Sequence, residues 1–205
     1  SFSIILLIVT FIIGVFFYTI FHLISINYQQ NHRYEQLIRV EKLKEFNNSY
    51  SWIVLDVITD FDKIQIVNLR IKKALLLFKD LSSLKTEIIN NSESQEEKKN
   101  LILIFTYFEA MQTMIKEDLY ALVLKKNSNL KVFNKKFESI HIDTQQALKQ
   151  EINYLKNKLK QTQDLRTTFL DTIKLELLVV FVVLFLLSFV ISSKIIKEIK
   201  EKLYR

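Results

Sequence analysis

Two stretches of the chain are almost entirely apolar, and a long amphipathic region separates them. The first is FSIILLIVTFIIGVFFYTIFHLISI, residues 2–26, and the second is LELLVVFVVLFLLSFVISS, residues 175–193. A helix of about 20 apolar residues crosses the hydrocarbon core of a bilayer. The second stretch carries one charge, Glu176, at an end where a carboxylate reaches the headgroups. The pattern therefore predicts transmembrane helices at 1–26 and 175–193.

Residues 27–174 repeat apolar positions in steps of three and four, which is the period of amphipathic helices. Such an outer domain leaves and re-enters the same membrane surface, so we expect antiparallel helix pairs of similar length. The turn-like FNNSYS, residues 46–51, is rejected as a reversal because the apolar steps continue through it and the next helix would then descend into the bilayer. A reversal at TDFDK, residues 59–63, makes the first two helices equal in length.

The later boundaries are marked by polar clusters. NNSESQEE, residues 90–97, predicts a loop, and Ser94 with Glu97 has the spacing of a capping box. A third helix is expected to about residue 126, followed by a connecting stretch through KKNSN and ESIHID, with Asp143 as the cap of a fourth helix. The prediction is an all-α fold: an antiparallel up-down four-helix bundle continuous with two transmembrane helices.

Composition and charge support helices and set an orientation. One Gly and no Pro in 205 residues leave few helix breakers, and the absence of Cys excludes disulfides and thiol chemistry. The net charge of +7 is concentrated partly after the second apolar stretch, in the segment 194–205. Basic residues beside a span mark the cytoplasmic side, so both termini are expected in the cytoplasm and the bundle on the periplasmic or extracellular side. The expected partner is membrane lipid, and no nucleic acid.

No catalytic residues are expected, because the chain has no Gly-rich phosphate loop, no nucleophile turn and no paired His spacing. For the same reasons we expect no enzyme activity, metal site or cofactor in this chain.

A ligand site is predicted from heights in the bundle. If the first reversal centres on residue 61, Trp52 and Arg70 lie level on neighbouring helices. Near that level the third helix offers Glu117, Asp118 and Tyr120, and the fourth offers Glu151. An Arg in a bundle needs an acidic side chain or an anionic ligand group as partner, and both alternatives stay open.

Two further segments are candidates for signal relay. Thr162 and Arg166 interrupt the apolar seam in KQTQDLRTTF, residues 160–169. This interruption predicts either local fraying or a solvated face near the headgroups, or a loose segment that transmits a helix shift. In the tail, Ile196, Ile199 and Leu203 are apolar positions separated by steps of three and four residues.

The order of a first span, an outer helical bundle, a second span and a basic amphipathic helix resembles the input half of bacterial transmembrane receptors, namely chemotaxis receptors and sensor histidine kinases with four-helix sensor domains. The resemblance covers the whole chain as architecture. It implies that SSKIIKEIKEKL, residues 192–203, begins a HAMP-type linker, with Ile196, Ile199 and Leu203 on its seven-residue seam. It also implies that an output domain follows residue 205. It also implies a homodimer in the inner membrane that senses a small extracytoplasmic ligand or a partner protein. The competing interpretation is a membrane-tethered structural scaffold without a ligand.

Overall fold

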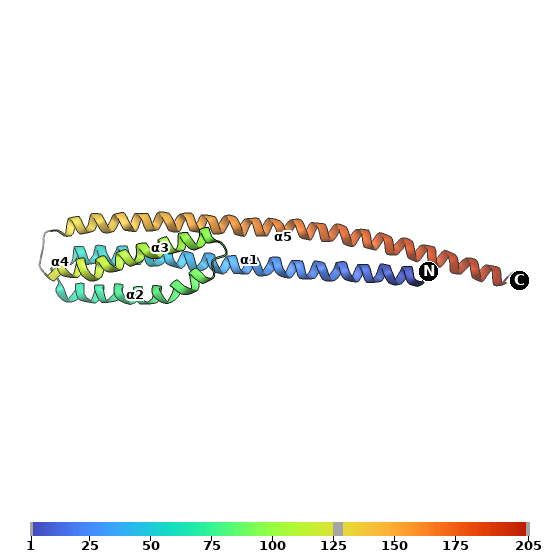
Figure 1. Ribbon diagram of the computed structural model, residues 1–205, viewed down its shortest axis with the longest axis horizontal. Helices are drawn as coiled ribbons and strands as arrows, with labels where there is room; N and C mark the ends of the chain where they lie inside the picture. The colour runs from blue at the N-terminus through green and yellow to red at the C-terminus, as the bar shows by residue number, and fades with distance from the viewer. Residues whose placement is uncertain (1, 125–128, 204–205) are drawn as a thin grey trace. The chain divides into compact units, whose positions relative to one another are not determined.

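The computed structural model describes residues 2–124 and 129–203, with the side chains of all of these except residues 2–6 and 198. Apart from short turns, these residues are helical, so the chain is all-α as predicted. The elements in chain order are α1 (Phe2–Thr59), α2 (Ile64–Asn90), α3 (Gln95–Thr113), η1 (Met114–Leu119), α4 (Tyr120–Leu124) and α5 (Leu130–Leu203) (Figure 1). The chain divides into two compact units, which we call the bundle, residues 32–159, and the apolar unit, residues 1–31 with 160–205.

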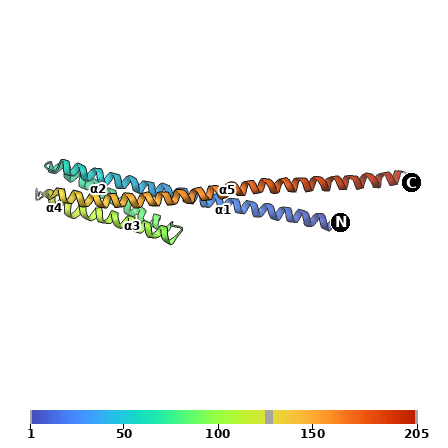
Figure 2. The same ribbon diagram turned by 90° about the horizontal axis from the view of Figure 1, so that it is seen from above.

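The bundle packs four helical segments side by side: the second part of α1, α2, the run of α3 with η1 and α4, and the first part of α5 (Figures 1 and 2). Cross-helix contacts show that α1 and α2 are antiparallel, since Arg39 binds Glu87 near one end and Arg70 binds Asp60 near the other. The helices enclose a single cluster of buried apolar side chains drawn from all four segments.

Helix α1 runs without interruption through the turn-like residues 46–51, as the apolar spacing predicted. Asn47 occupies a buried position of the seam and donates a hydrogen bond from Nδ2 to the carbonyl of His141, 3.3 Å away. One turn later Tyr50 is buried with its ring stacked on Phe78, at a centroid distance of 4.0 Å. The predicted reversal is also confirmed, because residues 60–63 form the turn between α1 and α2.

The turn between α2 and α3 ends in the predicted capping box. Ser94 is the N-cap residue of α3, and its side chain accepts a hydrogen bond from the Glu97 amide at 3.1 Å. The Glu97 carboxylate accepts in return from the amide of Glu93 at 2.9 Å. Because this box satisfies free amides of the first turn, α3 already begins at Gln95, inside the loop predicted for residues 90–97.

The predicted start of the fourth helix is wrong. Helix α5 begins at Leu130, so the expected connecting stretch from there to residue 142 is helical, and Asp143 is an exposed interior residue rather than a cap. The physical reason is a continuous buried face, since Phe133, Phe137 and Thr144 are all buried at helical spacing. The expected end of the third helix, at about residue 126, lies outside the described residues.

A π-helical turn, η1, interrupts the third segment. Ile115, Leu119 and Val123 are all buried, although two successive steps of four residues would drift by roughly 80° around an α-helix. The wider π turn absorbs this drift and keeps all three side chains on the core face. The apolar pattern of the sequence did not predict this π turn.

The apolar unit contains the two stretches predicted as spans. Each lies in a helix that is long and apolar enough to cross a membrane, and none of the residues in its most apolar window is buried. Within this unit the rings of His22 and Phe169 are 4.5 Å apart, and Arg166 Nη1 lies 3.5 Å from Gln30 Oε1. The two helical segments of the unit are therefore in contact along this stretch.

Candidate functional site

Arg70, the centre of the predicted ligand site, is bound by acidic side chains of its own chain. Its Nη1 donates to Asp60 Oδ2 at 2.6 Å and to the Asp56 carbonyl at 2.5 Å. Its Nε is 3.8 Å from Asp56 Oδ2. Hydrogen bonds from Lys63 and from Arg70 lower the pKa of Asp60. Of the two alternatives for Arg70, the acidic partner is the one observed.

The other predicted ligand residues lie in different surroundings. Trp52 is 67% exposed, Tyr120 is 42% exposed, and Glu117 is also on the surface. Glu151 is instead fully buried and accepts a hydrogen bond from Asn100 Nδ2 at 3.1 Å. The structure thus gives Arg70 and Glu151 separate partners and does not bring them together. A role of Trp52, Glu117 and Tyr120 in ligand binding stays a prediction.

The misplacement of Glu151 follows from the start of α5. The predicted height assumed a helix that begins at Asp143, whereas α5 begins at Leu130. The difference of 13 residues corresponds to roughly 20 Å along a helix axis. Glu151 therefore lies beside the first turns of α3, where Asn100 is its partner.

Two buried acidic residues, Glu97 on α3 and Glu151 on α5, lie in the packing between these helices. Burial raises the pKa of Glu151 to about 7, against the hydrogen bond from Asn100, and burial also raises the pKa of Glu97. The second carboxylate oxygen of Glu151, Oε1, is buried and has no hydrogen-bond partner among the described residues. Close by, the hydroxyl groups of Ser94 and Tyr154 are 3.4 Å apart. This region can take up a proton, and in that state it needs no counter-charge.

An ion pair and hydrogen bonds join the α2–α3 turn to the first bundle residues of α1. Arg33 binds Glu93 at 2.6 Å, and Gln36 Nε2 donates to the carbonyl of Asn91. The ring nitrogen Nε2 of His32 lies 3.2 Å from the same carbonyl. These contacts hold the turn against the residues of α1 that directly follow its apolar stretch.

A polar layer lies between α1 and α5 in the middle of the bundle. Besides the hydrogen bond of Asn47 to the His141 carbonyl, three atoms are buried without a partner among the described residues: Asn47 Oδ1, Tyr50 OH and His141 Nδ1. Burial lowers the pKa of His141 and raises that of Tyr50, so it favours the neutral form of both side chains.

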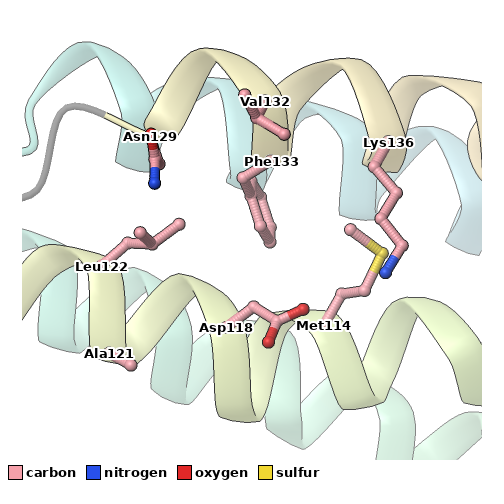
Figure 3. Close-up of a pocket in the computed structure, with 8 residues that line it drawn as sticks. All are labelled: Met114, Asp118, Ala121, Leu122, Asn129, Val132, Phe133 and Lys136. Carbon is pink, nitrogen blue, oxygen red and sulfur yellow. The ribbon is translucent and has the colours of Figure 1, made fainter.

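A hollow of the bundle lies between the third segment and the start of α5, and we call it the α4–α5 groove (Figure 3). It has a volume of about 360 Å³. Its first wall comes from η1 and α4, and its second from the residues that open α5. The lining residues are Met114, Asp118, Ala121, Leu122, Asn129, Val132, Phe133 and Lys136.

The chemistry of the α4–α5 groove combines an apolar floor with two opposite charges. Phe133 and Met114 are nearly fully buried, and Figure 3 shows the Phe133 ring between the two walls. Asp118 on η1 and Lys136 on α5 are exposed at the rim of the groove. Such a groove can hold a small molecule that has an apolar body and charged ends.

Most of the residues that line this groove were not predicted from the sequence. Asp118 was placed near the predicted site, but Phe133 and Lys136 fell in the stretch expected to be a connection. A signal was present, because Asn129, Val132, Phe133 and Lys136 are spaced by three and four residues, as on one face of a helix.

The predicted relay residues lie on α5 and belong to the apolar unit. The helix is regular through residues 160–169, with Thr162 buried and Arg166 exposed beside Gln30. In the tail, Ile196, Ile199 and Leu203 are exposed apolar side chains. Their role in signal relay stays a prediction.

Comparison with known proteins assigns the chain to no family. No family model matches it, and neither the curated proteins nor the solved structures give a match. Among the described residues there is also no group of three or more His, Cys, Asp or Glu side chains that could hold a metal ion. The function must be argued from the residues of this chain.

Proposed function

We propose that the chain is the sensing and signal-relaying input module of a bacterial receptor, of the sensor histidine kinase or chemotaxis receptor type. In this proposal the apolar stretches of α1 and α5 cross the cytoplasmic membrane and the bundle lies on the outer side. The protein works as a homodimer, and a HAMP-like linker begins in the tail.

The observation that carries the proposal is that the same two helices supply both the apolar stretches and core positions of the bundle. Leu43 and Val54 of α1 are buried in the bundle core, as are Leu148 and Leu155 of α5. Both helices continue from these positions to the apolar residues, with no Gly or Pro between. A change in core packing can therefore shift or rotate the same helices that carry the apolar stretches.

The basic tail supports the proposed orientation. Lys194, Lys197, Lys200, Lys202 and Arg205 follow the second apolar stretch within twelve residues, as on the cytoplasmic side of a span. The apolar seam of the tail gives the helix a face through which a displacement can reach a following domain.

A tethered scaffold accounts for the same helices and predicts no coupling between the bundle and the tail. A ligand shifts a receptor between two states only by its difference in affinity for them, typically by about 1–3 kcal/mol. In a scaffold, the rotational phase of the tail has no consequence. Phase is therefore the property that separates the two functions.

The test is a set of in-register fusions of residues 1–205 to a HAMP-kinase output, with one to four alanines inserted after Ser193. Each inserted residue rotates the seam of Ile196, Ile199 and Leu203 by about 100°. We expect basal kinase activity to rise and fall with the number of inserted residues. An alanine inserted after Asp62, in the α1–α2 turn, is the control because it leaves the phase of α5 unchanged. Activity that is the same for all tail insertions favours the scaffold.

A further inference from the structure

We propose that the α4–α5 groove binds a small zwitterion, a molecule with one ammonium group, one carboxylate and a compact apolar body. This inference deepens the proposed function and rests on it, because it gives the sensing bundle a ligand site of defined chemistry.

The groove carries one acidic and one basic side chain. Asp118 and Lys136 stand on facing walls, and among the ion pairs formed by the described residues neither takes part in one. A ligand ammonium group directed at Asp118 and a ligand carboxylate directed at Lys136 form two charge-assisted contacts. A ligand with only one charge leaves one wall without its partner.

The apolar body of the ligand fits the floor. Phe133 is held in place by its neighbour Phe137, with ring centroids 6.0 Å apart in a stacked arrangement. Val132, which is 68% exposed, and Leu122 offer apolar surface that a ligand can cover. The volume of about 360 Å³ lies at the small end of the usual range of ligand pockets, roughly 300–1,000 Å³. The groove therefore favours a compact ligand.

The π turn explains why a carboxylate stands on this wall. Ile115, three residues before Asp118, and Leu119, directly after it, are both buried in the core. The wider turn keeps them there and leaves Asp118 at the rim of the groove. Turns of this kind occur frequently at functional sites.

Calorimetry with the full chain in lipid nanodiscs tests the inference with three probes that share one benzyl body. L-phenylalanine carries both charges, 3-phenylpropanoate only the carboxylate, and phenethylamine only the ammonium group. We expect L-phenylalanine to bind one molecule per chain, at least about tenfold more tightly than either of the other two.

Two exposed rim residues provide the variants. Asp118→Asn should weaken L-phenylalanine about five- to tenfold and leave 3-phenylpropanoate unaffected, because only the ammonium contact is lost. Lys136→Gln should weaken L-phenylalanine similarly and leave phenethylamine unaffected. Glu138→Gln and Lys135→Gln are the matched controls, since both residues are exposed neighbours of Lys136 on α5 that do not line the groove.

Equal affinities for the three probes, no binding of L-phenylalanine in the millimolar range, or the same loss in the control variants would overturn the inference. Binding is measured here without any output domain, and the tail insertions measure relay without any ligand. A failure of the groove is therefore distinguishable from a failure of the relay.

Discussion

Burial favours the neutral forms of two ionisable side chains of α5, Glu151 and His141. The pKa of Glu151 is raised from 4.5 to about 7, and that of His141 is lowered from 6.5, in both cases chiefly by desolvation. The two pKa shifts therefore have opposite effects on how stability changes with pH. Glu151 makes the fold less stable as the pH rises, and His141 makes it less stable as the pH falls below its unfolded pKa.

Replacing Glu151 with Gln should remove one of these dependences. The folded protein binds the Glu151 proton more tightly than the unfolded chain, so the contribution of this residue is most favourable below pH 4.5 and is lost as the pH rises towards 7. At pH 8 we expect Glu151→Gln to be more stable than the unmodified chain, by an amount on the order of 3 kcal/mol. At pH 5 the gain should largely disappear. Thermal unfolding of both proteins across this range measures the difference.

Glu45 gives the matched control, because it is exposed on α1. Glu45→Gln should follow the unmodified chain at every pH. Melting temperatures of Glu151→Gln that stay parallel to those of the unmodified chain from pH 5 to pH 8 would show that Glu151 ionises freely in the fold.

At the scale of the element, the continuity of α1 can be tested with proline. Asn48 lies in the interior of the helix, next to the buried Asn47. Asn48→Pro removes a helix hydrogen bond and introduces a ring clash, which costs about 3 kcal/mol or more. Ile64→Pro is the control, because Ile64 is the first residue of α2 and proline is well tolerated there. Equal unfolding midpoints in urea for the two variants would contradict the continuous helix.

The cap of α3 makes a smaller but definite contribution. Ser94→Ala removes the hydroxyl that accepts the Glu97 amide, and we expect a loss of about 1 kcal/mol in unfolding free energy. Ser83→Ala is the comparison, since Ser83 is exposed within α2 and alanine is the better helix former. If both substitutions change stability equally, the cap contributes nothing of its own.

An element could be predicted from the sequence where residue patterns mark where its helix begins, continues or ends. The course of α1 through Asn47 was predictable because apolar steps on both sides keep one phase, and the α3 cap was predictable from Ser94 and Glu97. The start of α5 was not, because polar residues and Asp143 resemble a helix start while Phe133 and Phe137 carry the seam onward. The π turn has no residue signature, and the α4–α5 groove depends on two helices whose pairing no local pattern shows.

At the scale of the whole molecule, the orientation in the membrane is the first property to establish. Because the chain has no cysteine, single reporters can be placed at Ser92, in the α2–α3 turn, and at Lys200, in the tail. Cysteine at Ser92 should react with an impermeant thiol reagent in intact cells, and cysteine at Lys200 only after the cells are opened. The reason is the basic cluster, which retains the tail in the cytoplasm. Labelling of the Lys200 reporter in intact cells would reverse the proposed orientation.

In genetic terms, the π turn makes the α4–α5 groove depend on a single codon. A π turn closes its hydrogen bonds over one residue more than an α turn does. Deleting one codon within Met114–Leu119 would therefore let α3 continue into α4 as an ordinary α-helix, with apolar residues still available for the core. Where the deleted codon is that of Asp118, the rim of the groove also loses its carboxylate. A lineage of such proteins can thus acquire or discard this charged rim by an in-frame insertion or deletion, while the bundle itself persists.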